Sequence, residues 1–158
     1  MKNNIWETLS QIDCSKHTEK KGNLTYLSWA WAWRTLMVHY PTARYQFTDH
    51  RDYNGNITDI QVYADGTASV ECTVTIEELS RTISLPVMDH RNQAIQNPNA
   101  RQISDSKMRC LVKAIAMHGL GFYIYAGEDL PESPSSSVKG NSTVSQQSVK
   151  WANVSQNS

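Results

Sequence analysis

The sequence has few of the features by which disulfides, bound zinc or a membrane stabilise or anchor a protein. Its three cysteines, Cys14, Cys72 and Cys110, lie far apart, and no CxxC or HxxxH spacing accompanies them. This disfavours a disulfide framework and a structural zinc site, and it predicts buried free thiols. There is no run of eighteen apolar residues, and the first residues, MKNNIWETLSQIDC, lack the apolar stretch of a signal peptide. These absences predict a cytoplasmic protein without a membrane anchor.

An excess of charge of either sign is also missing, because 15 Lys and Arg balance 15 Asp and Glu. This excludes strong attraction of nucleic acid by the molecule as a whole, although not by a local patch. The charges are unevenly spread: the net charge is +2 for residues 1–42, −5 for 43–80, +4 for 81–118 and −1 for 119–158. Two interpretations stay open. The chain has two solvated faces of opposite sign, or it has a basic surface for a polyanion, with the acidic region held away or meeting a neighbouring subunit.

The motifs of several enzyme classes are absent. No Walker A pattern GxxxxGK[ST] occurs, which excludes a RecA-like ATPase, and neither HExxH nor GxSxG is present. A metal-dependent nuclease stays open as an alternative, with Asp89 and His90 near Glu71 or Glu77. In the competing interpretation, Asp89 orders its own loop by accepting backbone hydrogen bonds. We expect no cofactor and no catalytic activity.

What remains is the composition of an ordinary globular domain. The 158 residues are 39% hydrophobic and 19% charged, enough for one domain with its own core. The last segment, PESPSSSVKGNSTVSQQSVKWANVSQNS, is rich in Ser, Asn and Gln and predicts disorder. We therefore divide the chain into a folded domain, 1–130, and a disordered tail, 131–158. Trp151 in the tail is either incidental or a docking motif for a partner protein.

Residues 24–39, LTYLSWAWAWRTLMVH, predict a helix that has Thr25 as its N-cap and ends before Pro41. Its apolar surface runs nearly all round, which predicts deep burial or a contact between subunits. One of its tryptophans is a candidate for stacking on bases, and core packing accounts for the others.

Between residues 43 and 88 the apolar positions follow a period of two. The turn signals Asn54-Gly55 and Asp65-Gly66 separate the predicted strands. One strand, residues 67–78, places four apolar side chains on one face: Val70, Cys72, Val74 and Ile76. The pattern predicts an antiparallel meander of three to four strands whose apolar face needs helices to cover it, hence an α+β fold.

A long polar loop, residues 89–102, precedes a second helix at 103–118 with Ser104 or Asp105 as its cap. Gly119 and Gly121 end this helix, and a short strand or extended segment is expected within residues 122–131. The apolar side chains that should face the sheet are Met108, Leu111, Val112 and Ile115.

The opposite face of this helix holds Arg109 and Lys113 one turn apart, on a stripe with Gln102, Asp105 and Ser106. Lys107 flanks the apolar arc from its other edge. Any amphipathic helix needs a polar face, but that need does not explain why Asp105 is the only acid there. A groove that faces phosphates accounts for the scarcity of acids.

Three segments, YLSWAWAW, LPVMDHRNQAI and ISDSKMRCLVKAIAMHGLGFYIYAGEDL, resemble the Sak-type phage single-strand annealing proteins over roughly residues 5–131. The helix is also distantly similar to that of the eukaryotic Rad annealing proteins, where a basic run ends in an aromatic-Gly pair; here His118-Gly119 stands at that point. The resemblance implies a β-β-β-α core, assembly into rings or filaments, and ATP-independent pairing of complementary single strands in the host cytoplasm. Val112 and Ala116 stand where relatives carry cations, so Lys113 is the clearest correspondence.

Annealing requires that a strand be held by its phosphates while its base edges stay free. Lysine and arginine supply this sequence-independent attraction, which weakens with salt. The candidate DNA-binding residues are Arg91, Arg101, Lys107, Arg109 and Lys113, together with His90 and with Tyr53 at a hairpin tip. A neutral chain predicts weak binding by one subunit and a gain in a homo-oligomer. A host single-strand-binding protein is a further partner to consider, and a phage regulator that binds a host or satellite repressor is the second alternative.

Overall fold

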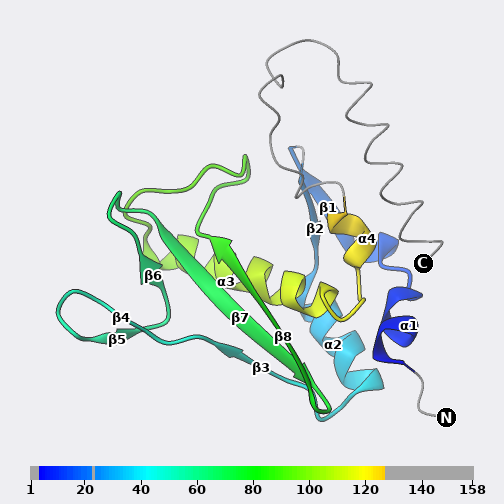
Figure 1. Cartoon of the computed structure of the whole chain (residues 1–158). Helices are drawn as coiled ribbons and strands as arrows, with labels where there is room; N and C mark the ends of the chain where they lie inside the picture. Colours follow the sequence, from blue (N-terminus) through cyan, green and yellow to red (C-terminus); the bar gives the residue numbers. More distant parts are fainter. Residues whose placement is uncertain (1–3, 23, 127–158) are drawn as a thin grey trace.

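The computed structural model describes residues 4–22 and 24–126, which form an antiparallel sheet, helices against one of its faces, and two separate β-hairpins (Figure 1). The predicted tail, 131–158, and Trp151 lie outside the described residues. In chain order the elements are α1 (Ile5–Ser10), the 3-10 turn η1 (Ser15–His17), β1 (Thr18–Lys21), β2 (Leu24–Leu27), α2 (Trp29–His39), β3 (Arg44–Phe47), β4 (His50–Arg51), β5 (Ile57–Thr58), β6 (Gln61–Val62), β7 (Ala68–Ile76), β8 (Leu79–Pro86), α3 (Ala100–Ala116) and α4 (Phe122–Tyr125). The predicted α+β class is confirmed. None of the described helices has the length and apolarity needed to span a membrane.

The main sheet is built around β7, which has antiparallel neighbours on both edges. Thr75 of β7 is paired with Ser80 of β8 and Arg44 of β3, so β8 and β3 lie on opposite edges. The short β6 pairs with the other end of β7, on the edge shared with β3. The chain between β3 and β6 leaves the sheet and forms the protruding β4–β5 hairpin (Figure 1). The strands are therefore antiparallel as expected, but their order is not that of a simple meander.

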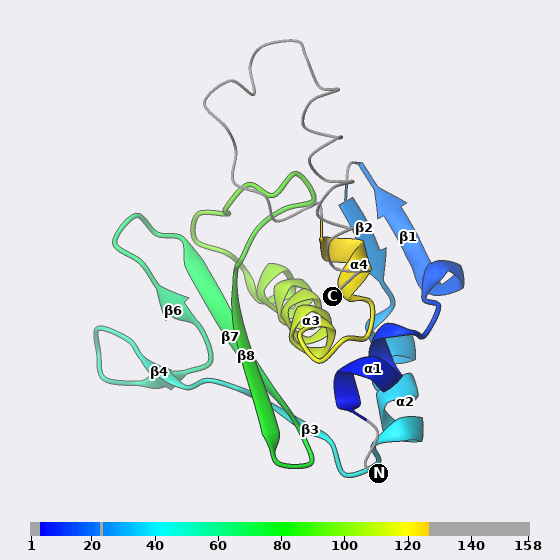
Figure 2. The same cartoon turned by 45° about the vertical axis from the view of Figure 1, so that its right-hand side comes forward.

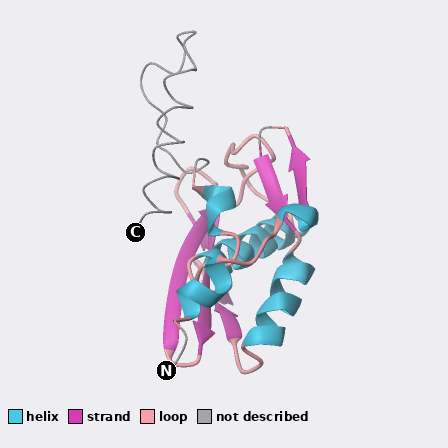
Figure 3. Cartoon of the chain, turned by 90° about the vertical axis from the view of Figure 1, so that its right-hand side faces the viewer, coloured by secondary structure: helices cyan, strands magenta, loops and turns pink. Residues whose placement is uncertain are grey.

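The alternation predicted for β7 is confirmed. Val70, Cys72, Val74 and Ile76 are all fully buried, and α3 packs across this face of β7 and β8 (Figure 2). The opposite face is polar, with hydroxyl pairs across the strands such as Thr73 Oγ1 with Thr82 Oγ1 at 2.7 Å. Figure 3 shows the helices layered against the sheet. The hydrophobic driving force acts on one face only, and this fixes which side of the sheet α3 covers.

All three cysteines are free and buried, as predicted. Burial raises the pKa of the Cys72 and Cys110 thiols to about 12 and that of Cys14 to about 11. These thiols are therefore protonated at neutral pH and belong to the core.

The single helix predicted for residues 24–39 is wrong in its first half. Leu24–Leu27 forms β2, which pairs with β1, and Thr25 lies within that strand. The N-cap is Ser28, whose hydroxyl accepts a hydrogen bond from the Trp31 amide at 3.3 Å. The β1 sequence TEKK is charged and carries no apolar alternation, so apolar periodicity does not predict the hairpin.

The α2 helix is also less buried than its composition predicted. Ala32 and Leu36 are buried, whereas Val38 is 72% exposed and Trp29 is 49% exposed. An apolar residue on a helix is thus no guarantee of a core position, because apolar atoms also supply much of any protein surface.

The start of α3 differs from the prediction as well. Its N-cap is Asn99, which with Gln102 forms a capping box: the Asn99 side chain accepts from the Gln102 amide at 2.9 Å, and Gln102 Oε1 accepts from the Asn99 amide at 3.0 Å. Ser104 and Asp105 are therefore inside the helix, and Arg101 lies in its first turn rather than in a loop. Ser106, expected on the cationic stripe, is buried. The capping box was missed because Asn-x-x-Gln is a weak variant of the usual pattern.

The strand expected within residues 122–131 is wrong for its described part, which forms the short helix α4. Gly119 and Gly121 do end the α3 segment as predicted, both with positive φ. A Cβ at Gly119 would lie 3.0 Å from the Trp6 carbonyl oxygen, so the close approach of α1 requires glycine there.

Candidate nucleic-acid interface

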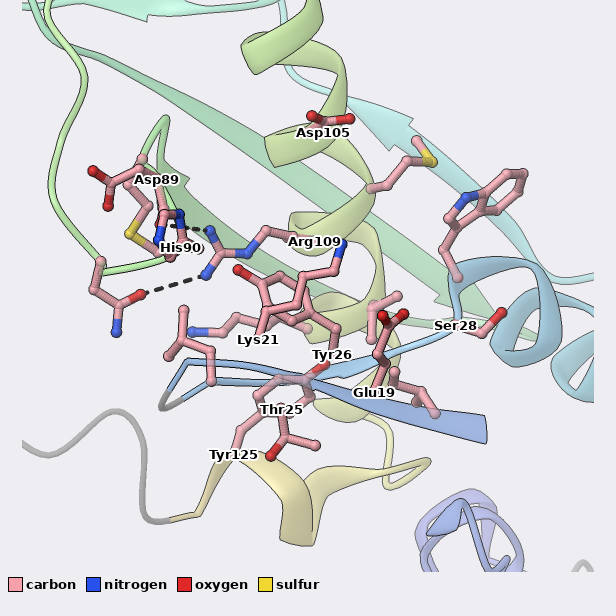
Figure 4. A pocket seen from close by; sticks show the side chains of 18 of the residues that line it. Glu19, Lys21, Thr25, Tyr26, Ser28, Asp89, His90, Asp105, Arg109 and Tyr125 are labelled. Carbon is pink, nitrogen blue, oxygen red and sulfur yellow. Dashed lines mark hydrogen bonds between the residues drawn. The ribbon is translucent and has the colours of Figure 1, made fainter. Parts of the chain in front are cut away.

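A groove with a volume of about 790 Å³ lies between the β1–β2 hairpin and α3. The segment after β8, the N-terminus of α2 and Tyr125 complete its walls. In Figure 4, Asp89 and His90 lie on one side of the view and Ser28 on the other, with Arg109 and Tyr26 between them. The groove exists because the hairpin stands apart from the main sheet and faces the cationic side of α3.

Arg109 and Lys21 meet over one aromatic ring. The Arg109 guanidinium carbon lies 5.0 Å from the centroid of the Tyr26 ring, and Lys21 Nζ lies 5.5 Å from the same centroid. One cation comes from α3 and the other from the hairpin, so Tyr26 joins the two walls of the groove (Figure 4). A cation–π contact stabilises by about 0.5–1 kcal/mol at exposed sites. It also leaves the formal charge uncancelled, because the ring carries none.

The remaining contacts of Arg109 are also with neutral groups. Its guanidinium donates to the Asp89 carbonyl oxygen and to Asn92 Oδ1, each at a long 3.4 Å. One turn further along α3, Lys113 Nζ lies 5.6 Å from the centroid of the Tyr125 ring. Arg109 is therefore positioned by its neighbours while its charge is available to an anion in the groove.

Three carboxylates also line the groove, so its charge is mixed. The cations are Lys21, Arg101, Arg109 and Lys113, and the acids are Glu19, Asp89 and Asp105. Counting formal charges, four against three, the lining is +1 with histidines neutral. Arg101 and Asp105 form an exposed i,i+4 ion pair at 3.4 Å, a kind of pair worth little in water.

Asp89 is committed to its own loop. Its Oδ1 accepts hydrogen bonds from the amides of Arg91 at 2.8 Å and Gln93 at 3.0 Å. These backbone hydrogen bonds hold the pKa of Asp89 below its usual value. The loop-ordering role predicted for Asp89 is confirmed.

The structure brings together four of the seven predicted DNA-binding residues, since His90, Arg101, Arg109 and Lys113 all line the groove. The other three do not line it. Arg91 is exposed in the adjoining loop. Lys107 forms an ion pair with Asp59 and lies over the Phe47 ring, and Tyr53 is 96% exposed in the β4–β5 hairpin. DNA contacts by these three residues stay predictions without support from the groove.

Several groove residues were missed by sequence reasoning: His17, Lys21, Tyr26 and Tyr125. The first three lie in the hairpin or directly before it, and of these only Tyr26 falls in the segment predicted as a helix, residues 24–39. Trp29 is one of the tryptophans considered above for base stacking, and it does line the groove. The interleaving of basic and aromatic residues in HTEKKGNLTYLSW was the available signal, because nucleic-acid grooves combine these two types. Tyr125 was assigned to a strand, so its position gave no such signal.

Within residues 4–22 and 24–126, no three His, Cys, Asp or Glu side chains converge to hold a metal ion. Glu71, considered for a nuclease site, instead accepts a hydrogen bond from Thr48 Oγ1 at 2.8 Å. Glu77 lies outside β7, in the turn before β8, with a positive φ of 57°.

The fold and the groove together define a class: an α+β protein with cations and aromatic rings along one groove, the combination found in sequence-independent single-strand binders. The comparison with protein families agrees with this class. A family model described as Sak Single Strand Annealing Protein matches residues 4–153, and the chain belongs to this family, as its motifs predicted. None of the curated proteins matches the chain.

Proposed function

We propose that this protein binds single-stranded DNA in the groove between the β1–β2 hairpin and α3, and that it anneals complementary strands without ATP during phage recombination. The observation that carries the proposal is the placement of Arg109 and Lys113 along one groove wall, opposite Lys21. Membership of the Sak family supports annealing in general. The proposed site of action is the cytoplasm of the host cell.

The chemistry is binding rather than bond-making. Two strands repel each other through their phosphates, and cations that neutralise one backbone lower the cost of bringing the second strand close. Arg109, Lys113 and Lys21 are the proposed phosphate contacts, with Arg101 at the rim. Their attraction is independent of sequence, as annealing of arbitrary complements requires.

We propose that the protein acts as a homo-oligomer, a ring or a filament. A groove whose lining has a net charge of +1 binds a strand weakly. Several such grooves in one oligomer bind the same strand more tightly through multivalency. Exposed apolar side chains support contacts between copies, with Ile57 and Tyr53 in the β4–β5 hairpin and Val38 on α2. These two elements lie on different sides of the molecule (Figures 1 and 2), and contact between unlike surfaces builds rings or filaments. A host single-strand-binding protein is proposed as the source of the strands.

The test is the double variant Arg109→Ala with Lys113→Ala. Loss of two phosphate contacts should abolish annealing, and it should lower the slope of log affinity against log salt by about 1.4, at about 0.7 per contact on single strands. Annealing of labelled complementary oligonucleotides and a salt titration of binding measure the two effects.

The matched control is Arg34→Ala with Arg44→Ala, which removes the same charge from exposed positions outside the groove. This control should anneal normally. Wild-type binding by the groove variant would refute the proposed site. Incubation with labelled single strands and Mg²⁺ should leave them shifted but intact, and cleavage would support a nuclease instead. Binding that survives high salt would point to the regulatory protein.

A further inference from the structure

Trp29 occupies an unusual position at the rim of the groove. It is the first residue of α2, it lines the groove, and it is half-exposed. Its backbone is held firmly, because Ser28 caps the helix and the Ser28 amide donates to the His17 carbonyl oxygen at 3.0 Å. Figure 4 places Ser28 beside the groove, at the start of α2. The indole therefore projects from a fixed point.

The other tryptophans of the described region have aromatic partners. Trp31 stacks on His17 with ring centroids 4.2 Å apart and planes 12° from parallel. Trp33 meets Tyr45 edge to face at 5.0 Å, and Trp6 meets Phe122 at 5.1 Å. Trp29 has no such partner among the residues that the structure describes.

The tyrosine rings of the groove already contact cations of the protein itself. Tyr26 carries both Arg109 and Lys21 over its ring, and Lys113 lies over the ring of Tyr125. Within the described part of the chain, no ring or cation lies over the indole of Trp29. Core packing does not explain this residue, because it is not among the side chains packed against the hydrophobic core. A half-exposed indole in a groove that cations also line suits a ligand that has both an apolar ring and a negative charge.

We propose that Trp29 is the base-stacking platform of the groove, and that one nucleobase of the bound strand lies against its indole in each subunit. This inference rests on the proposed function. The cations of α3 and the hairpin hold phosphates, while Trp29, on α2 in the same groove, takes a base of that strand. Stacking uses the face of a base and leaves its Watson–Crick edge free, as pairing with a second strand requires. A base within a duplex has both faces covered by its neighbours, so Trp29 selects unpaired strands.

The test compares a thymidine oligonucleotide with an abasic sugar–phosphate chain of equal length and charge. The wild-type protein should prefer the base-bearing chain by about 5- to 150-fold, the ratio that corresponds to about 1–3 kcal/mol per stacked base. Trp29→Ala should lose most of this preference while keeping its affinity for the abasic chain, because the phosphate contacts remain. Trp29→Phe should keep part of the preference.

Trp6→Ala is the control, since Trp6 is a partly exposed indole on α1 that does not line the groove. It should keep the full preference. Circular dichroism tests whether each variant is folded. If Trp29→Ala is unfolded, the indole fluorescence of Trp29→Phe tests the stacking role of Trp29 in its place. Single strands should quench the emission of the wild type and of Trp6→Phe, but much less that of Trp29→Phe.

The outcomes separate the two proposals. If the Trp29 variants keep the wild-type preference and quenching, this inference is overturned while the annealing function stands. If the wild-type protein binds neither chain, the proposed function fails and takes this inference with it.

Discussion

At the residue scale, charged and titratable side chains act according to what surrounds them rather than by their type. Arg109 and Lys107 are both basic residues of α3, two positions apart. Arg109 faces neutral groups in the groove, whereas Lys107 is paired with Asp59 on another side of the helix. The charge count along the chain detected both cations, but only their neighbours tell which of them is available to a phosphate.

His118 is buried against the sheet, and its protonation is coupled to folding. Its Nε2 lies 2.8 Å from the Val74 carbonyl oxygen, while Nδ1 is buried without a hydrogen-bond partner. Burial lowers the pKa of His118 below its ordinary value of about 6.5. Between the two pKa values, His118 is protonated in the unfolded chain but neutral in the folded one. Its contribution to the free energy of unfolding is therefore complete above about pH 6.5 and decreases as the pH falls toward the folded-state pKa.

We therefore expect the melting temperature to fall between pH 7 and pH 5. His118→Gln, whose amide nitrogen can donate to Val74, should flatten this dependence even if the variant is less stable at pH 7. Thermal unfolding followed by circular dichroism at both pH values measures the effect. An equally steep decline in the variant would show that other groups cause it.

At the element scale, local hydrogen bonds decide where the groove helices begin. The Ser28 cap starts α2 later than apolar periodicity predicted, and the Asn99–Gln102 capping box starts α3 earlier than predicted. The box adds the turn that carries Arg101 to α3. Apolar spacing locates the middle of a helix well, because burial governs it, but caps govern the ends.

Asn99→Ala should lower the free energy of unfolding by about 1 kcal/mol, because the first turn of α3 loses a capping side chain. Asn99→Asp is the matched control: it keeps an acceptor oxygen and adds a charge that suits a helix N-terminus, so it should be close to wild type. Urea unfolding of the three proteins measures the difference. Equal stability of Ala and wild type would mean that the box contributes nothing to α3.

At the scale of the whole molecule, the chain is neutral and its groove is weakly charged, so strong binding of a strand requires several copies of the groove. If subunits present their grooves in series, a strand gains affinity with each further groove that it reaches. A single groove with a net charge of +1 gives no such gain.

Binding should therefore tighten strongly with oligonucleotide length beyond the span of one subunit, and the particle mass should exceed that of a 17.9 kDa monomer. Affinity titrations over a series of oligothymidines, with analytical ultracentrifugation in parallel, test both expectations. A monomer whose affinity levels off at the length of one groove would contradict the proposed oligomer.

Part of this architecture follows from the sequence alone. The period of two in β7, the apolar spacing of α3 and the breaks at Gly119 and Gly121 predicted the sheet, its covering helix and the end of that helix. Met108 and Val112, which were expected to face the sheet, line the groove instead. The clustering of cations on one side of α3 singled out Arg109 and Lys113. Burial drives all of these features, and burial leaves a periodic trace in the sequence.

Only the tertiary structure decided what faces those cations. The β1–β2 hairpin has charged residues in one strand and no apolar alternation there, so apolar periodicity did not predict its pairing. Its position over α3 brings Lys21 and Tyr26 to Arg109, and the N-terminus of α2 brings Trp29 to the same groove. Such contacts join segments that lie far apart in the chain, as Tyr26 and Arg109 do. Long-range contacts between polar surfaces leave no local pattern in a single sequence.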